Sequence, residues 1–306
     1  MRVLFAGTPA VAVPSLDALL AAGFNVVAVL TRPDAPVGRK RVMTPSPVAA
    51  RAQELGLPVI QASKVDAAVT DRIAAVQPDV AAIVAYGGLI PGPALDVPRH
   101  GWVNLHFSLL PAWRGAAPVQ RSIMAGDDVT GAVTFRLEEG LDTGPVFGTL
   151  TEAVGPRDTA GQLLERLSHS GAVLLAQTLS AIGTGQAAPV PQHGDVTLAP
   201  KLTLEDGKVD WQQPALAIDR QIRGVTPEPG GWTSLAGQRV KLEPVIPHPG
   251  AVNLAPGTVE LRGKTVLVGT GSHAVELTRV QPAGKKMMAA PDWARGMASQ
   301  ESVVFE

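Results

Sequence analysis

The strongest constraint on the fold is a series of short, uninterrupted apolar runs in the first half of the chain. Residues 3–6, 26–30 and 80–85 lack the polar alternation of a strand with one face in water, which is typical of parallel strands buried on both faces. A stretch with helical spacing at 11–22, closed by Gly23, separates the first two runs. A strand, a helix and a strand within about 30 residues predict a βαβ unit with a right-handed crossover.

Similar patterns continue to residue 182. Helices are predicted at 48–55, 67–76, 118–125 and 159–182, and strands at 58–60, 102–108, 131–137 and 146–152. Together they predict a doubly wound, mostly parallel α/β sheet of the Rossmann-like kind, in which ligands bind at the carboxyl ends of the strands. Residues 183–200 are rich in Gly, Pro and polar side chains, which is typical of a linker.

The pattern changes in the last third of the chain. One helical stretch at 214–223 is followed by short β-like runs at 232–235, 239–245, 257–261, 265–268 and 274–280, separated by Gly and Pro. Such runs predict a small, OB-like β-barrel. We therefore predict an α/β domain at 1–185, a linker at 186–206 and a C-terminal β-barrel domain at 207–306.

The segment 31–47 matches neither a helix nor a strand and is predicted to be a long loop. It holds four prolines and, behind Gly38, the basic run Arg39, Lys40 and Arg41. Long loops in compact domains are commonly functional or disordered. From these residues alone, a solvated loop is the simpler interpretation of the three cations.

The composition excludes several kinds of site. The 306 residues contain no cysteine, which removes disulfides, thiolate zinc sites and cysteine nucleophiles. A net charge of −1 argues against a wholesale nucleic-acid binder but leaves room for a local basic patch. The turn after the first strand is not Gly-x-Gly-x-x-Gly, and a Walker A loop is absent. No apolar stretch approaches 18 residues and no signal peptide is evident, so we expect a cytoplasmic protein.

The best candidate site begins in the run from Asn104 to Ser108. If this run is a strand, alternation places Asn104 and His106 on one face, and Pro111 opens the chain into a loop. Asp142, flanked by glycines, could return to the same cleft. An imidazole exchanges a proton near neutral pH, an amide donates to an oxyanion, and a carboxylate orients the ring. These groups suit acyl transfer to an amine without a covalent nucleophile, although His106 alone would more often be structural.

Two further features bear on ligands. Tyr86, Gly87 and Gly88 follow the strand at 80–85, where paired glycines either let a ligand approach the backbone or make a tight turn. The other histidines are scattered without ligand spacing, so no metal site is assigned.

These residues carry a resemblance to a known family. The string Asn104-Leu105-His106-Phe107-Ser108-Leu109-Leu110-Pro111, with Asp142 further on, resembles the signature of the 10-formyltetrahydrofolate-dependent formyltransferases. Three other strings are similar to the family members that act on initiator tRNA: Phe5-Ala6-Gly7-Thr8-Pro9, Leu110-Pro111-Ala112-Trp113-Arg114-Gly115-Ala116-Ala117-Pro118 and Gln281-Pro282-Ala283-Gly284-Lys285-Lys286. The likeness covers essentially the whole chain.

The resemblance implies transfer of a formyl group from 10-formyltetrahydrofolate to the α-amine of methionine on initiator tRNA. From the sequence we also expect no metal, no membrane association and no obligate protein partner. Asn104 and His106 would flank the formyl carbon, and Asp142 would position a water and tune His106. The residues expected at the folate are Ser108, Leu109, Leu110, Pro111, Tyr86, Gly87 and Gly88.

The resemblance also implies contacts with the tRNA. The loop at 31–47 would meet the acceptor arm through Arg39, Lys40 and Arg41. The C-terminal domain is not strongly basic overall, so a local face would have to contact phosphates. The residues predicted for that face are Lys285 and Lys286, with Arg220, Arg223, Arg239 and Lys241 as further candidates.

Three other functions stay open from the sequence. Glycinamide ribonucleotide formyltransferases share the three residues, but they usually lack a second domain and have a glycine- and serine-rich phosphate loop in place of Gly7-Thr8-Pro9. Sugar-nucleotide formyltransferases share both domains but should not need the basic run at 39–41. A non-catalytic RNA-binding module is disfavoured by the intact Asn104, His106 and Asp142.

Overall fold

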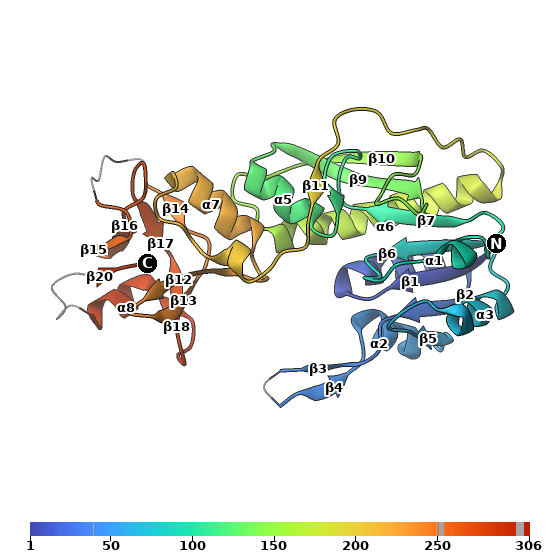
Figure 1. The fold of residues 1–306 in the computed structure, drawn as a ribbon, viewed down its shortest axis with the longest axis horizontal. Helices are drawn as coiled ribbons and strands as arrows, with labels where there is room; N and C mark the ends of the chain where they lie inside the picture. Colours follow the sequence, from blue (N-terminus) through green and yellow to red (C-terminus); the bar gives the residue numbers. More distant parts are fainter. Residues whose placement is uncertain (39, 249, 251–253, 298–302) are drawn as a thin grey trace. The chain divides into compact units, whose positions relative to one another are not determined.

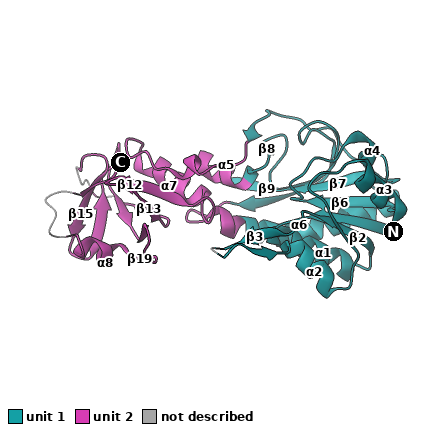
Figure 2. Cartoon of the chain, turned by 60° about the horizontal axis from the view of Figure 1, so that its bottom comes forward, with its two compact units in different colours: residues 1–118, 129–153, 164–199 teal, residues 119–128, 154–163, 200–306 magenta. Residues whose placement is uncertain are grey.

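The computed structural model describes residues 1–38, 40–248, 250, 254–297 and 303–306 (Figure 1). The chain divides into two compact units, each discontinuous in sequence (Figure 2). Unit 1 comprises residues 1–118, 129–153 and 164–199, and unit 2 comprises residues 119–128, 154–163 and 200–306. The three residues predicted to be catalytic all fall within unit 1.

Within the described residues, unit 1 is built on a seven-stranded sheet with the order β10-β9-β7-β6-β1-β2-β5. The parallel strands are β1 (Arg2–Gly7), β2 (Asn25–Thr31), β5 (Val59–Gln61), β6 (Val80–Val84) and β7 (Trp102–His106). At one edge β9 (Val129–Arg136) pairs antiparallel with β7, and β10 (Val146–Ala153) pairs antiparallel with β9. The predicted doubly wound, mostly parallel sheet is confirmed.

The helices largely follow the predicted boundaries. They are α1 (Val13–Ala21), preceded by the 3-10 turn η1 (Ala10–Ala12), α2 (Pro47–Glu54), α3 (Ala67–Ala75), α4 (Gly92–Leu95), α5 (Pro118–Ala125) and α6 (Ala160–Gly183). The N–H of Ala49 donates to the Ser46 hydroxyl at 3.0 Å, which caps α2. The sequence does not predict α4, because four residues are too few to show a periodicity.

The central strands β1 and β6 are buried on both faces, which explains their uninterrupted apolar runs. Leu4 of β1 belongs to a core cluster with Ile73 of α3 on one face of the sheet. Val3 and Phe5 point to the opposite face by strand alternation, and they are equally buried.

The prediction of an irregular loop at 31–47 is wrong in its centre. There, β3 (Ala35–Val37) and β4 (Val42–Thr44) pair antiparallel, and a 2.7 Å hydrogen bond joins the Thr31 and Ser46 side chains at the base. In Figure 1 this hairpin extends away from the sheet of unit 1. Every residue of both strands is exposed. Strands of three residues with no buried face leave no hydrophobic alternation to recognise.

Residues 190–199 form an extended segment, here called the strap, that is bonded along unit 1. Val190 bridges to Val146 of β10, and β11 (Leu198–Ala199) pairs in parallel with β8 (Arg114–Gly115). A segment of linker-like composition is therefore held along unit 1 by backbone hydrogen bonds. Its sequence shows no apolar periodicity that would predict this.

Within its described residues, unit 2 holds two antiparallel sheets that follow the 3-10 turn η2 (Glu205–Gly207) and α7 (Ala215–Gly224). The strand orders are β12-β13-β18-β19 and β14-β17-β16-β15-β20. The strands are β12 (Gly231–Leu235), β13 (Gln238–Leu242), β14 (Ile246–Pro247), β15 (Thr258–Arg262), β16 (Thr265–Val268), β17 (Val275–Leu277), β18 (Arg279–Pro282), β19 (Met288–Ala289) and β20 (Val303–Val304). The prediction that the C-terminal part consists of short strands is confirmed.

Aromatic stacking lies at the centre of unit 2. The Phe305 ring stacks on Trp211 and on Trp293, with centroids 5.5 Å and 5.6 Å apart. Trp293 belongs to α8 (Ala290–Arg295), a helix that the sequence does not predict because six residues show too little periodicity. Among the described residues, no helix is both long and apolar enough to cross a membrane.

Candidate active site

A cavity of about 500 Å³ lies where β6 and β7 end. Asn104 and His106 line it from β7, residues 85–90 from the turn after β6, and residues 137–142 from the loop after β9. Because β6 and β7 are parallel neighbours, both end at the same edge of the sheet, which is where ligands bind in doubly wound folds. The structure therefore brings Asn104, His106 and Asp142 to one cavity.

His106 is held between two acceptors. Its Nε2 lies 2.9 Å from the Trp113 carbonyl oxygen, and its Nδ1 lies 3.7 Å from Oδ2 of Asp142. A carbonyl only accepts, so Nε2 carries the proton when the ring is neutral, and Nδ1 is left as the basic nitrogen. The Phe135 ring meets the imidazole edge to face, with centroids 6.4 Å apart.

Burial lowers the pKa of His106 below its ordinary value of 6.5. The Asp142 carboxylate and the hydrogen bond to Trp113 raise this pKa, but they offset only part of the effect of burial. His106 is therefore neutral near pH 7. A neutral ring with a nearby carboxylate can accept a proton at Nδ1 and is stabilised once it has done so.

Asp142 is fixed by its own backbone contacts. It is 9% exposed, and its Oδ2 accepts the N–H of Gly115 at 2.7 Å. Gly115 has a φ of 124°, and a Cβ there would lie 2.7 Å from the Ala199 carbonyl oxygen. Only glycine fits at this position, because any other residue would be strained at this φ and its Cβ would clash with Ala199. The close pairing of β8 with β11 therefore depends on a glycine whose amide also binds the carboxylate.

The residues expected at the folate divide into two groups. Tyr86, Gly87 and Gly88 line the cavity, whereas Ser108, Leu109, Leu110 and Pro111 are not among the described residues that do so. The Ser108 hydroxyl donates to the Ala112 carbonyl at 2.6 Å, within the loop after β7. A Cβ on Gly88 would lie 2.8 Å from the Tyr86 ring, so this turn needs a glycine for packing.

Some cavity residues were missed by the sequence reasoning. Leu89 is 90% exposed and Leu141 is 59% exposed, yet both line the cavity. Glu138 and Glu139 line it as well. Their positions in the sequence could have identified the two leucines, because Leu89 follows the glycine pair and Leu141 directly precedes Asp142. Exposed leucines around a cavity are typical of the apolar wall of a small-molecule site.

Four of the residues predicted to contact tRNA lie at the turns of two exposed hairpins, one in each unit. Lys40 and Arg41 are exposed at the turn between β3 and β4, whereas Arg39 lies outside the described residues. Lys285 and Lys286 are exposed in the connection between β18 and β19. Arg239 is also exposed, with its guanidinium 5.7 Å from the Trp232 ring centroid.

The suggestion of Arg223 as a further phosphate contact is wrong. Its side chain is only 7% exposed. Its Nε donates to Asp219 at 2.9 Å, and its Nη1 donates to the Asp158 carbonyl at 2.9 Å. The helical spacing of α7 turns this arginine inward, where a buried carboxylate neutralises it.

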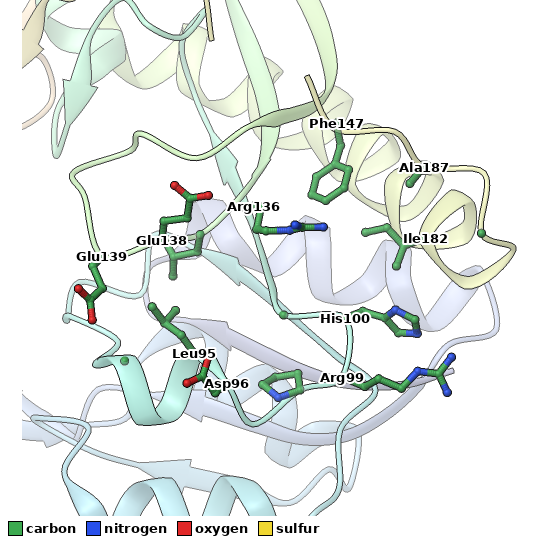
Figure 3. Close-up of a pocket in the computed structure, with 15 residues that line it drawn as sticks. Leu95, Asp96, Arg99, His100, Arg136, Glu138, Glu139, Phe147, Ile182 and Ala187 are labelled. Carbon is green, nitrogen blue, oxygen red and sulfur yellow. The ribbon is translucent and has the colours of Figure 1, made fainter. Parts of the chain in front are cut away.

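Unit 1 has a second cavity, of about 790 Å³, which Figure 3 shows. Basic side chains gather on one side of it (Arg99, His100, Arg136) and acidic ones on the other (Asp96, Glu138, Glu139). Asn104, His106 and Asp142 are not among the described residues that line it. The larger cavity is therefore not the candidate catalytic site. In the described part of the chain, no cluster of His, Asp or Glu could hold a metal ion.

The fold and the cavity with Asn104, His106 and Asp142 can be compared with known proteins. The family described as "Formyl transferase" matches residues 1–179, and "Formyl transferase, C-terminal domain" matches residues 201–298. The chain belongs to the formyl transferase family. Among its relatives is the methionyl-tRNA formyltransferase of Arthrobacter sp. (strain FB24), which is 78% identical over 306 residues, 100% of both chains.

Solved structures of lower sequence identity share the fold. An N-formyltransferase from Helicobacter canadensis, in complex with folinic acid and dTDP-3-aminofucose, aligns with a TM-score of 0.70 at 16% identity, over 92% of this chain and 99% of that one. HypX from Aquifex aeolicus, in complex with tetrahydrofolic acid, aligns with a TM-score of 0.64 at 19% identity, over 98% of this chain and 47% of that one.

Proposed function

We propose that this protein transfers a formyl group from 10-formyltetrahydrofolate to the α-amino group of methionine on initiator tRNA, for translation initiation in the cytoplasm. The observation that carries the proposal is the His106–Asp142 pair beside Asn104 in one cavity. The full-length relative from Arthrobacter, a methionyl-tRNA formyltransferase, supports the choice of acceptor.

The three side chains divide the work of formyl transfer to an amine. Attack of the amine on the formyl carbon leaves a negative oxygen and a surplus proton on the nitrogen. The Asn104 amide donates to that oxygen, and Nδ1 of His106 accepts the proton. Asp142, whose Oδ2 lies 3.7 Å from Nδ1, stabilises the resulting imidazolium. The imidazolium then protonates the departing nitrogen of the donor, which returns His106 to its neutral state.

The cavity suits a folate as formyl donor. Its volume of about 500 Å³ lies within the range of roughly 300–1,000 Å³ that is common for small-molecule sites. Leu89 and Leu141 supply exposed apolar surface for a flat ring, and Gly87 and Gly88 present backbone without side chains. In this proposal Ser108 to Pro111 contribute through the loop after β7, whose carbonyl at Trp113 holds His106.

The tRNA is assigned to the exposed cations of both domains. Phosphate contacts need only a few well-placed lysines and arginines, so a net charge of −1 is no obstacle. We assign the acceptor arm to Lys40 and Arg41 of the β3–β4 hairpin and to Arg39, which lies outside the described residues, and further phosphates to Lys285 and Lys286. The catalytic part then corresponds to residues 1–185 and the tRNA-contacting domain to residues 207–306.

Other formyl acceptors are less well supported. A sugar nucleotide is favoured only by the likeness in fold to the Helicobacter enzyme, at 16% identity. A glycinamide ribonucleotide acceptor would leave the second matched domain, residues 201–298, without a role.

An assay with three acceptors tests the proposal. The purified protein is incubated with 10-formyltetrahydrofolate and either methionyl initiator tRNA, a dTDP-linked amino sugar or glycinamide ribonucleotide, with His106→Ala as the inactive control. We expect tetrahydrofolate release and formyl-methionine only with the tRNA. Faster turnover of either small acceptor would overturn the proposed substrate.

A further inference from the structure

The two residues that face the ring nitrogens of His106 have left-handed backbone conformations. Trp113, whose carbonyl accepts from Nε2, has a φ of 61°, and Asp142, whose carboxylate faces Nδ1, has a φ of 50°. Residues other than glycine adopt this conformation rarely, and they keep it only where surrounding contacts fix it. The geometry around His106 therefore depends on what holds these two backbone positions.

The strap holds both of them. Nε2 of Gln192 donates to the Asp142 carbonyl at 2.7 Å and to the Gly144 carbonyl at 2.8 Å. Further along the strap, the Thr197 hydroxyl accepts the N–H of Trp113 at 2.8 Å. A single segment thus bonds to both residues that face the ring nitrogens of His106.

Gln192 uses both ends of its amide. Its Oε1 accepts from Nη2 of Arg114 at 2.7 Å and from Nε at 3.2 Å, so the oxygen and the nitrogen cannot be exchanged without losing bonds. Gln192 is half-buried, whereas residues 191 and 193–198 around it are exposed. A glutamine that served only to keep a linker solvated would need none of these four bonds.

We propose that Gln192 is a positioning residue, which fixes the backbone of Asp142 and thereby the place of its carboxylate beside His106. The inference rests on the proposed function in that it takes the His106–Asp142 pair to be catalytic. Gln192 is not among the described residues that line the cavity, so it acts through Asp142 and not on the substrate. A glutamate at this position would place a carboxylate oxygen beside the carbonyl oxygens of Asp142 and Gly144, which would repel it. An alanine would leave these two carbonyls without their donor.

Two substitutions test the role by kinetics. Gln192→Glu keeps the size and removes the donor, Gln192→Ala removes the side chain, and His193→Ala changes the exposed neighbour as a matched control. We expect both Gln192 variants to lower kcat by up to roughly 10²-fold, the cost of misplacing a catalytic group by about 1 Å. The KM values for tRNA and folate should change little, and His193→Ala should match the wild type. A wild-type kcat in both Gln192 variants overturns the proposal.

A double-mutant cycle then identifies the route of the effect. In an Asp142→Ala background, Gln192→Ala should cost little more, because a carboxylate that is absent cannot be misplaced. If Gln192→Ala has its full effect in that background, it does not act through Asp142 and the inference is wrong.

NMR titration of the His106 ring tests the positioning without any measurement of activity. Asp142 raises the pKa of His106, so a displaced carboxylate in Gln192→Ala should lower that pKa relative to the wild type. An unchanged pKa overturns the inference whichever acceptor the wild type formylates. A lowered pKa in a protein that leaves methionyl-tRNA unformylated would contradict the proposed function alone.

Discussion

The cavity at the end of β7 and the tip of the β3–β4 hairpin differ in how much of their geometry is fixed before a substrate arrives. His106 is 7% exposed and lies between a carbonyl and a carboxylate. Asp142 in turn accepts from Gly115 and is bonded by Gln192. Lys40 and Arg41, in contrast, are exposed on a hairpin whose described strand residues all face solvent.

The contrast separates two kinds of electrostatic interaction, one between buried groups and one between exposed groups. Buried dipoles and charges interact strongly and need no rearrangement during the reaction, so single groups carry large shares of the rate. Exposed cations are screened by salt and share their effect among many phosphates. The two regions should therefore respond to substitution and to salt in opposite ways.

The largest effect is expected in the cavity. His106→Ala should lower kcat by roughly 10²–10⁴-fold, because it removes the only imidazole among the described residues that line this cavity. Asn104→Ala should cost about 10²–10³-fold through loss of the oxyanion donor. Steady-state kinetics measure both, with His100→Ala in the other cavity as the matched histidine control. Near-normal turnover by His106→Ala would contradict the proposed mechanism.

Asp142→Asn should have a smaller effect on the rate and a definite effect on titration. The substitution keeps an oxygen for the Gly115 amide but removes the charge that raises the pKa of His106. The wild-type ring should titrate below its ordinary pKa of 6.5, and the variant lower still. NMR of the imidazole resonances, assigned with His106→Gln, measures both shifts. A pKa that rises in Asp142→Asn would contradict the assignment.

The same pKa predicts how stability depends on pH. Between the lowered folded pKa of His106 and its unfolded value near 6.5, the unfolded chain binds more protons than the folded one. The contribution of His106 to stability is therefore complete above that range, and it is lost as the pH falls through the folded pKa.

The sequence predicts the sheet of unit 1 and the strand that holds the cavity well, because the spacing of apolar residues reveals buried strands. Continuous apolar runs predict the buried parallel strands, and alternation in β7 places Asn104 and His106 on one face. The cavity residues Leu89 and Leu141 were missed because an exposed leucine has no pattern until the fold surrounds it. The bonds of Gln192 could not be predicted either, because they join positions 50 and 78 residues apart.

The hairpin region was harder to predict for a physical reason. A strand is recognised by the face that it buries, and β3 and β4 bury none. The inward turn of Arg223 illustrates the same limit, because only the packing of α7 decides which of its charges reaches solvent. Charge alone therefore does not separate a phosphate contact from a buried ion pair.

Substitutions in the β3–β4 hairpin should affect activity less than those in the cavity and more than those at the β18–β19 connection. Lys40→Ala and Arg41→Ala together should lower kcat/KM for methionyl-tRNA several-fold, while the KM for the folate stays unchanged. The dependence of log Kd on log salt should become shallower by about one unit for each phosphate that the variant no longer neutralises. Arg72→Ala, at an exposed arginine of α3, provides the matched control. Equal salt slopes for the wild type and the double variant would show that the hairpin is only a solvated connection.

The smallest effect is expected at the β18–β19 connection of unit 2. Lys285 and Lys286 are exposed there, and the turn is closed by the N–H of Lys285 on the Pro282 carbonyl at 3.0 Å, so alanine at either position should leave the fold intact. Each substitution should weaken tRNA binding slightly and leave kcat with saturating tRNA unchanged, because phosphate contacts position the substrate without touching the reacting atoms. Lys264→Ala, at the exposed turn between β15 and β16, is the control for removal of one lysine from the same unit. Binding isotherms at several salt concentrations would separate the three variants. If Lys264→Ala weakens binding as much as the other two, tRNA affinity in this unit follows net charge, and Lys285 and Lys286 form no specific contact.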